Sequence, residues 1–227
     1  MKITDQQREL YRNEGYMILP GVIPPAMLEM LREECSYNLG YYDSIMDAKG
    51  VQTENISHRG KRYFINNRYR LSNRLWQFIF SDLMAEVARA TVGDDAYLFH
   101  EQWVVKGAEQ GMKFSWHQDS GYVKWYDPTT SHRPYVTCWC TLDDVSEKNG
   151  TVYLLPHSRA GTRGQIIDHT KEAGTNDPLH SVVQAGIRCR QGSDSPVQPP
   201  VQNVVLSVVG SHFSAHQDFQ KLNLERV

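Results

Sequence analysis

Residues 96–106 read AYLFHEQWVVK, a run that is rich in aromatic and β-branched side chains. Such side chains favour a pleated strand, so we expect a strand over this range. Residues 135–142, 151–155 and 201–209 have the same character and are also expected to be strands. The C-terminal half of the chain is therefore predicted to be mostly sheet.

The segments before this run have helical signals. Thr4 and Gln7 have the spacing of a capping box and predict a first helix that ends near Gly15. Pro24 and Pro25 are expected to open a second helix. Apolar residues at helical spacing predict a third helix over residues 72–91, and Gly93 supplies its end: Leu75, Trp76, Ile79, Leu83 and Val87.

Three segments have weaker signals. Residues 16–19 are expected to form a short strand, and residues 36–70, which are polar and weakly periodic, a loop with short strands. Residues 160–200 contain many Gly, Ser, Pro, Asp and Gln residues. This composition predicts a long, mobile insertion between core strands, of the kind that often covers an active site.

Helices followed by several strands, without βαβ alternation, favour an antiparallel barrel or a two-sheet jelly roll with N-terminal helices. We therefore expect a mainly β fold with flanking α-helices. The 227 residues suit a single domain. In that domain, residues 1–95 are the helical cover and first strands, and residues 96–227 are the core with its insertion at 160–200.

The bulk composition narrows the class of partner. A net charge of −2 provides no broad basic field, which argues against nucleic acid or an anionic membrane as the main partner. A small-molecule substrate fits better. The N-terminus has no apolar stretch of signal-peptide length, and no run approaches the ~20 apolar residues of a membrane span. We expect a cytoplasmic protein, and the sequence does not indicate its oligomeric state.

The four cysteines are sparse and lack the paired spacing of a zinc site, which predicts reduced thiols. Cys138 and Cys140 stand two apart in a predicted strand, so we interpret them as small core side chains on one face.

His117-Gln118-Asp119 is the main candidate for chemistry. In an extended segment, side chains two apart leave the same face, so an imidazole and a carboxylate meet a single metal ion. A second histidine from a distant strand would complete a facial triad, which leaves three positions open for a keto acid and O2. The tripeptide alone is weakly specific, because residues 216–218 repeat it.

Three separated blocks make the chain similar to one family. Residues 4–31 include the turn Glu14-Gly15-Tyr16, residues 114–122 include the His-Gln-Asp motif, and residues 136–156 include Trp139 and Asn149-Gly150. In order and spacing these blocks resemble the phytanoyl-CoA dioxygenase family of Fe(II)- and 2-oxoglutarate-dependent oxygenases. The resemblance implies a cupin-like double-stranded β-helix that uses Fe(II), 2-oxoglutarate and O2.

The resemblance also implies site residues. His117, Asp119 and His212 match the metal ligands, which are the catalytic centre, and His216 competes with His212 for the distal position. Gln102 and Trp139 match positions that contact the cosubstrate. Beside these positions, Tyr122, Trp125, Tyr126 and Tyr135 are candidates for an aromatic pocket.

The C-terminal end departs from the family pattern. Asn223 stands where the family has the arginine that pairs with the far carboxylate of 2-oxoglutarate, and Arg226, the nearest arginine, is the candidate to bind this carboxylate instead. A guanidinium makes a bidentate pair that an amide cannot imitate. We also expect the jelly roll to be incomplete at its C-terminal end, because the pattern has one more strand than this sequence.

The expected function is hydroxylation of a small organic substrate by an Fe(II)- and 2-oxoglutarate-dependent dioxygenase. Two alternatives stay open. One is a degenerate, catalytically impaired family member that acts as a binding or regulatory protein, which the altered C-terminal end favours. The other is a non-redox, cupin-like metal enzyme that uses zinc or manganese through the same ligands.

Overall fold

The computed structural model describes residues 1–107, 117–121, 129, 135–146 and 151–167, and the backbone of strands at 169–171, 181–183, 201–210 and 225–226. The helices are α1 (Asp5–Glu14), α2 (Pro25–Lys49), the 3-10 helix η1 (Arg68–Leu71), α3 (Asn73–Ile79), α4 (Asp82–Thr91) and α6 (His157–Ala160). The strands are β1 (Thr53–Glu54), β2 (Ser57–His58), β3 (Arg62–Asn66), β4 (Ala96–Lys106), β5 (Val136–Thr141), β6 (His169–Lys171), β7 (Ser181–Val183), β8 (Val201–Gly210) and β9 (Glu225–Arg226).

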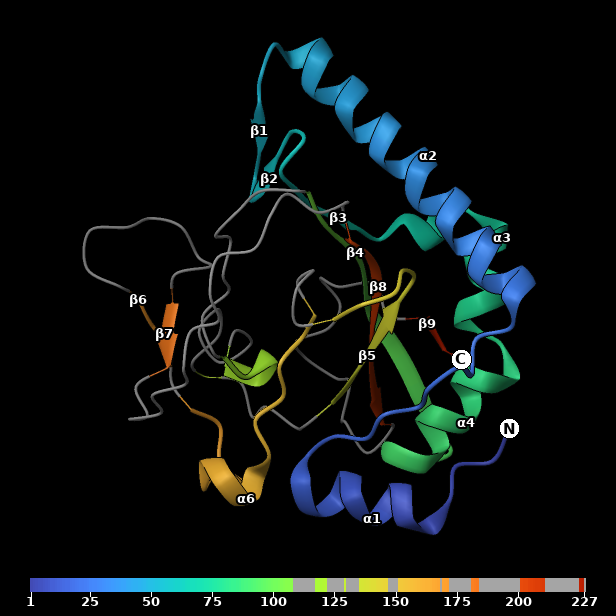
Figure 1. Ribbon diagram of the computed structural model, residues 1–227, viewed down its shortest axis with the longest axis vertical. Helices are drawn as coiled ribbons and strands as arrows, with labels where there is room; N and C mark the ends of the chain where they lie inside the picture. The colour runs from blue at the N-terminus through green and yellow to red at the C-terminus, as the bar shows by residue number, and fades with distance from the viewer. Residues whose placement is uncertain are drawn as a thin grey trace.

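The main sheet has seven strands in the order β1-β2-β3-β4-β8-β5, and β9 pairs with the start of β4. All of these pairings are antiparallel, and β6 and β7 form a separate hairpin. Strand β8 comes late in the chain but lies between β4 and β5, so strands distant in sequence form the centre of the sheet (Figure 1). The fold combines helix and sheet.

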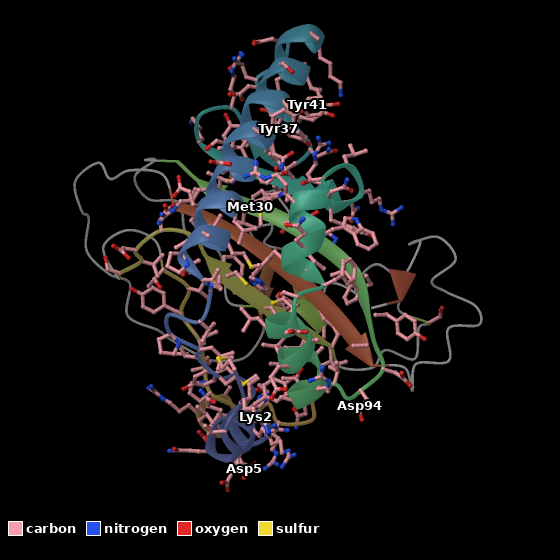
Figure 2. The ribbon with its side chains drawn as sticks, turned by 90° about the vertical axis from the view of Figure 1, so that its right-hand side faces the viewer. Lys2, Asp5, Met30, Tyr37, Tyr41 and Asp94 are labelled. Carbon is pink, nitrogen blue, oxygen red and sulfur yellow. The ribbon has the colours of Figure 1, made fainter. Side chains whose placement is uncertain are left out.

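Helices α2, α3 and α4 cover one face of the main sheet (Figure 1). Figure 2 looks onto this helical layer, with Met30, Tyr37 and Tyr41 along α2 and the strands behind it. The core lies between the two layers and includes Leu31 of α2 and Trp103 of β4, both wholly buried. Among the described residues, no helix has both the length and the apolar character that crossing a membrane requires.

Alternation along β4 separates the two faces of the sheet. Trp103 and Val105 belong to the helix-facing core, whereas Val104 is buried but lies outside that cluster. On β5, Cys138 and Cys140 pack against the same core, which confirms the prediction that they share one core face. The opposite face of β4 and β5 is therefore available for a site.

Helix α1 has the N-terminal capping box and the C-terminal glycine that the sequence predicted. Thr4 Oγ1 accepts from Gln7 N, Gln7 Oε1 accepts from Thr4 N, and Gly15 ends the helix with a left-handed φ of 82°. Helix α2 begins at the predicted prolines. The predicted strands at 96–106, 135–142 and 201–209 correspond to β4, β5 and β8.

Other expectations were wrong in part. Helix α2 continues to Lys49, so only the later part of residues 36–70 has short strands. The apolar side chains of α2 pack against the core, and this tertiary burial stabilises a segment with weak periodicity. Instead of one helix over 72–91 there are two, because the Ser81 hydroxyl accepts from Met84 N and starts α4 anew.

Residues 16–19 and 151–155, which were predicted to be strands, have no strand assigned. Strand propensity describes how well side chains fit a pleated surface, and it forms a strand only where a neighbour offers a hydrogen-bonding edge. Within the expected insertion at 160–200, the described part contains the β6–β7 hairpin.

Candidate active site

His117 and Asp119 lie close together, as the two-residue spacing predicted. His117 Nε2 is 3.5 Å from Asp119 Oδ1, and both side chains are partly exposed. They do not stand on a strand, however. Asp119 begins a helical turn in which Gly121 N donates to Gln118 O across 2.9 Å. The pair meets because the chain turns at this point, not because of strand alternation.

Strand β5 supplies a hydrogen bond to the Asp119 carboxylate. Thr137 Oγ1 donates to Asp119 Oδ2 across 2.8 Å. The two oxygens of the carboxylate therefore have different partners, since Oδ1 faces His117 and Oδ2 faces Thr137. This arrangement fixes the orientation of the carboxylate relative to the imidazole.

Two partly buried titratable side chains, Tyr135 and His100, lie near Asp119. Burial raises the pKa of Tyr135, and the charge of Asp119 raises it further. Burial lowers the pKa of His100, which the charge of Asp119 opposes. Asp119 thus lies near both residues, and Phe99 packs edge-on against the Tyr135 ring at 4.7 Å between centroids.

The sheet register places the predicted cosubstrate residues in one row. Gln102 on β4 pairs with Val205 on β8, which pairs with Trp139 on β5. Residues in one row share a face, and strands lie about 4.8 Å apart, so the backbones at Gln102 and Trp139 are about 10 Å apart with Val205 between them. Gln102 Nε2 also donates to Asn66 Oδ1 across 2.8 Å, which restricts its orientation.

The next row along the sheet contains the partners of Asp119. His100 pairs with Ser207, and Ser207 pairs with Thr137. Asp119 is thus attached to the sheet beside the row of Gln102 and Trp139 and on the same face, and His117 lies next to Asp119. Four of the six predicted site residues are brought together.

The side chains of the other two predicted site residues, His212 and Arg226, are not among the described parts of the structure. His212 and its competitor His216 lie outside the described residues, as does Asn223. For Arg226 only the backbone is described, and it pairs with Tyr97 at the start of β4. Within the described residues, no group of three His, Cys, Asp or Glu side chains is gathered as a metal site. The distal ligand stays a prediction.

The two described candidate ligands, His117 and Asp119, fit an iron ion in type and separation. Imidazole nitrogen and carboxylate oxygen are the donors of the two-histidine, one-carboxylate triad. Two such atoms, each about 2.1 Å from one ion and at right angles, are about 3 Å apart. The 3.5 Å between His117 Nε2 and Asp119 Oδ1 is near this value.

Three residues near the pair were not predicted to have a role at the site. These are Thr137, which holds Asp119, His100, which lies near Asp119, and Gln118, whose side chain binds residues 165 and 167. The sequence contained a signal for two of them. His100 stands two positions from Gln102, and Thr137 two positions from Trp139, so each shares a strand face with a predicted cosubstrate residue. No sequence pattern marked the Gln118 contact.

Comparison with known families identifies the chain. The family model for phytanoyl-CoA dioxygenase (PhyH) matches residues 11–203. The chain belongs to the phytanoyl-CoA dioxygenase family. This confirms the resemblance that the sequence blocks indicated.

Two curated relatives support the enzyme class of this family member. A probable alpha-ketoglutarate-dependent hypophosphite dioxygenase of Stutzerimonas stutzeri is 22% identical, over 92% of this chain and 68% of its own length. The peroxisomal phytanoyl-CoA dioxygenase of Homo sapiens is 21% identical, over 79% of this chain and 54% of its own length. The chain thus spans about half to two thirds of these relatives. The predicted class, a 2-oxoglutarate-dependent dioxygenase, is the class of its relatives.

Solved structures of non-haem oxygenases share the fold of this phytanoyl-CoA dioxygenase family member. EctD from S. alaskensis with bound Fe has a TM-score of 0.62 at 18% identity, over 92% of this chain and 77% of that chain. EctD with 2-oxoglutarate and 5-hydroxyectoine has a TM-score of 0.61 at 15% identity, with the same coverage. The carbocyclase SnoK from nogalamycin biosynthesis has a TM-score of 0.56 at 14% identity, over 92% and 85%. The expected cofactors, iron and 2-oxoglutarate, are those of these neighbours.

Proposed function

We propose that this chain hydroxylates a small organic substrate as an Fe(II)- and 2-oxoglutarate-dependent dioxygenase. The observation that carries the proposal is the 3.5 Å separation of His117 Nε2 and Asp119 Oδ1, with the second carboxylate oxygen held by Thr137. Family membership supports it, and one matched relative is a probable alpha-ketoglutarate-dependent dioxygenase.

The remaining parts of the site complete the proposal. His212, which follows β8, is the proposed third ligand, with His216 as the alternative. Gln102 and Trp139 would face the cosubstrate, and Arg226 would supply a cation for its far carboxylate. We also propose that residues 96–227 form a double-stranded β-helix, as the shared fold of the oxygenase neighbours suggests.

The chemistry divides between the cofactors and the chain. Bound iron, with 2-oxoglutarate and O2, would supply an oxidant for C–H bonds and yield succinate and CO2. The chain contributes ligands, orientation and exclusion of water. Thr137 orients Asp119, and the partly buried side chains of Tyr135 and His100 lie near that carboxylate.

Binding of the cofactors tests this proposal directly. Fe(II) and 2-oxoglutarate are added to the full chain without O2, and the weak visible charge-transfer band of a chelated keto acid is recorded. We expect the band for the wild type and for Asp94→Ala, an exposed acid at the turn before β4 (Figure 2). Asp119→Ala should abolish it.

Turnover separates the remaining possibilities. After O2 is admitted, succinate formation without added substrate is measured, and the oxygenase proposal predicts slow, uncoupled formation. A band without succinate would indicate an impaired binding protein. The absence of both signals in a wild type that still binds zinc or manganese would instead indicate a non-redox metal enzyme.

A further inference from the structure

Residues 156–167, here called the hook, connect helix α1 to the segment of the metal ligands. The hook begins with α6, which lies beside the C-terminal end of α1 (Figure 1). Glu14 Oε2 accepts from Ser158 Oγ at 2.7 Å and from Ser158 N at 3.1 Å. These bonds lower the pKa of Glu14, so the carboxylate is favoured in the charged form that anchors the hook.

The hook is also ordered within itself. His157 Nδ1 lies 3.0 Å from the hydroxyl of Thr162, which is 7% exposed, and Gln165 N donates to Thr162 O across 3.0 Å. Gly161 ends α6 in the left-handed region and reverses the chain. The far end of the hook is thereby brought to the segment of His117 and Asp119.

Gln118 is the residue that joins this end of the hook. Its Nε2 donates to Gln165 O across 3.1 Å, and its Oε1 accepts from Ile167 N across 2.7 Å. The carboxamide thus uses both its donor and its acceptor on one short stretch of backbone. Two bonds in opposite directions fix the amide plane, which a single bond would leave free to rotate.

Gln118 lies between the two ligands in sequence, so its fixed side chain restricts the backbone that carries both. Asp119 has a second restraint from Thr137, whose hydroxyl donates to its carboxylate. We propose that Gln118 is a positioning residue, whose clamp on Gln165 and Ile167 holds His117 and Asp119 at ligand separation. This inference rests on the proposed function of the same site.

The test replaces Gln118 with methionine, which keeps the length of the side chain and removes both hydrogen bonds. Gln165→Ala is the matched control, because Gln165 contributes its backbone carbonyl and not its side chain. Outer partners of metal ligands typically change affinity by 10- to 100-fold. We expect Gln118→Met to weaken Ni(II) binding, measured by calorimetry on the full chain, by about that factor. Gln165→Ala should bind Ni(II) as the wild type does.

Hydrogen exchange of the Ile167 amide provides a readout that needs no metal. This amide donates to Gln118 Oε1, so its exchange should accelerate in Gln118→Met and stay slow in Gln165→Ala. Unchanged exchange in Gln118→Met would overturn the clamp. Faster exchange with unchanged Ni(II) affinity would show a clamp that does not position the ligands, and would also overturn the proposal. A wild type that binds no Ni(II) would refute the metal site itself, and with it this role of Gln118.

Discussion

Thr137 Oγ1 donates to Asp119 Oδ2 across 2.8 Å, although the two residues stand 18 positions apart in the chain. The bond occupies the carboxylate oxygen that points away from His117 and leaves Oδ1 beside the imidazole. Strand β5, which also carries Trp139, therefore determines the orientation of Asp119, the carboxylate of the proposed triad.

Replacing Thr137 with valine tests the importance of this bond. Valine has nearly the same shape but no hydroxyl, so Asp119 loses its second restraint. We expect Ni(II) or Fe(II) affinity to fall by about 10- to 100-fold, as for other outer partners of metal ligands. Thr137→Ser, which keeps the hydroxyl, should retain most of the affinity. Equal metal affinity in the valine and serine variants would contradict a role for the bond.

Glu101 should make the stability of the protein depend on pH. Its side chain is wholly buried, and burial raises the pKa to about 7 from an ordinary value of 4.5. Between these values the folded state binds more protons than the unfolded state, so the free energy of unfolding falls as pH rises. The neutral form of Glu101 makes its full contribution to the free energy of unfolding below pH 4.5, and this contribution is lost as the pH rises through about 7.

The variant Glu101→Gln isolates this contribution. Glutamine imitates the neutral acid and still offers an oxygen to Tyr69 N, which donates to Glu101 Oε2 across 3.1 Å. The raised pKa corresponds to a loss of about 3 kcal/mol in the free energy of unfolding between pH 4.5 and about 7. Urea unfolding of both proteins between pH 4.5 and 8 should give a difference in stability that grows with pH. Parallel curves would show that Glu101 ionises normally.

Gly15 should not tolerate a side chain. Its φ is +82°, and an added Cβ would lie 2.3 Å from His157 Nε2 in the hook. We expect Gly15→Ala to lower the free energy of unfolding by roughly 2 to 4 kcal/mol, from the left-handed backbone and the clash together. Gly21→Ala is the control, because its φ is +65° but no atom of the described residues lies within 4 Å of the added carbon. It should cost only about 1 kcal/mol. Similar losses in the two variants would argue against tight packing of the hook on α1.

The thiols of Cys35 and Cys138 should be unreactive in the folded protein. Burial raises the pKa of each to about 12, with the charge of Asp143 adding to the shift at Cys35. At pH 8 about one thiol in 10⁴ is then ionised, and the thiolate is the reactive form. Mass spectrometry after brief alkylation should find both residues unmodified in native protein and modified in urea. Rapid native alkylation of Cys35 would contradict its burial in the core.

Local features of the fold were predictable from the sequence, because the residues that form them stand within a few positions of one another. The capping box of Thr4 and Gln7, the strand at residues 96–106 and the core face of Cys138 and Cys140 are examples. The prediction of a loop over residues 36–70 was wrong in part. Helix α2 extends into this range because it is stabilised by packing against a distant core rather than by its own periodicity.

The family and the spacing of His117 and Asp119 could be read from the chain alone, because ordered blocks and a two-residue interval are properties of the sequence. The bond of Thr137 to Asp119 and the bonds of Gln118 to the hook became visible in the folded structure. These contacts span 18 and 47 positions, and the energy of a hydrogen bond depends on distance and direction in space. Sequence separation carries no information about either, so such partners appear only once the sheet and the hook bring them together.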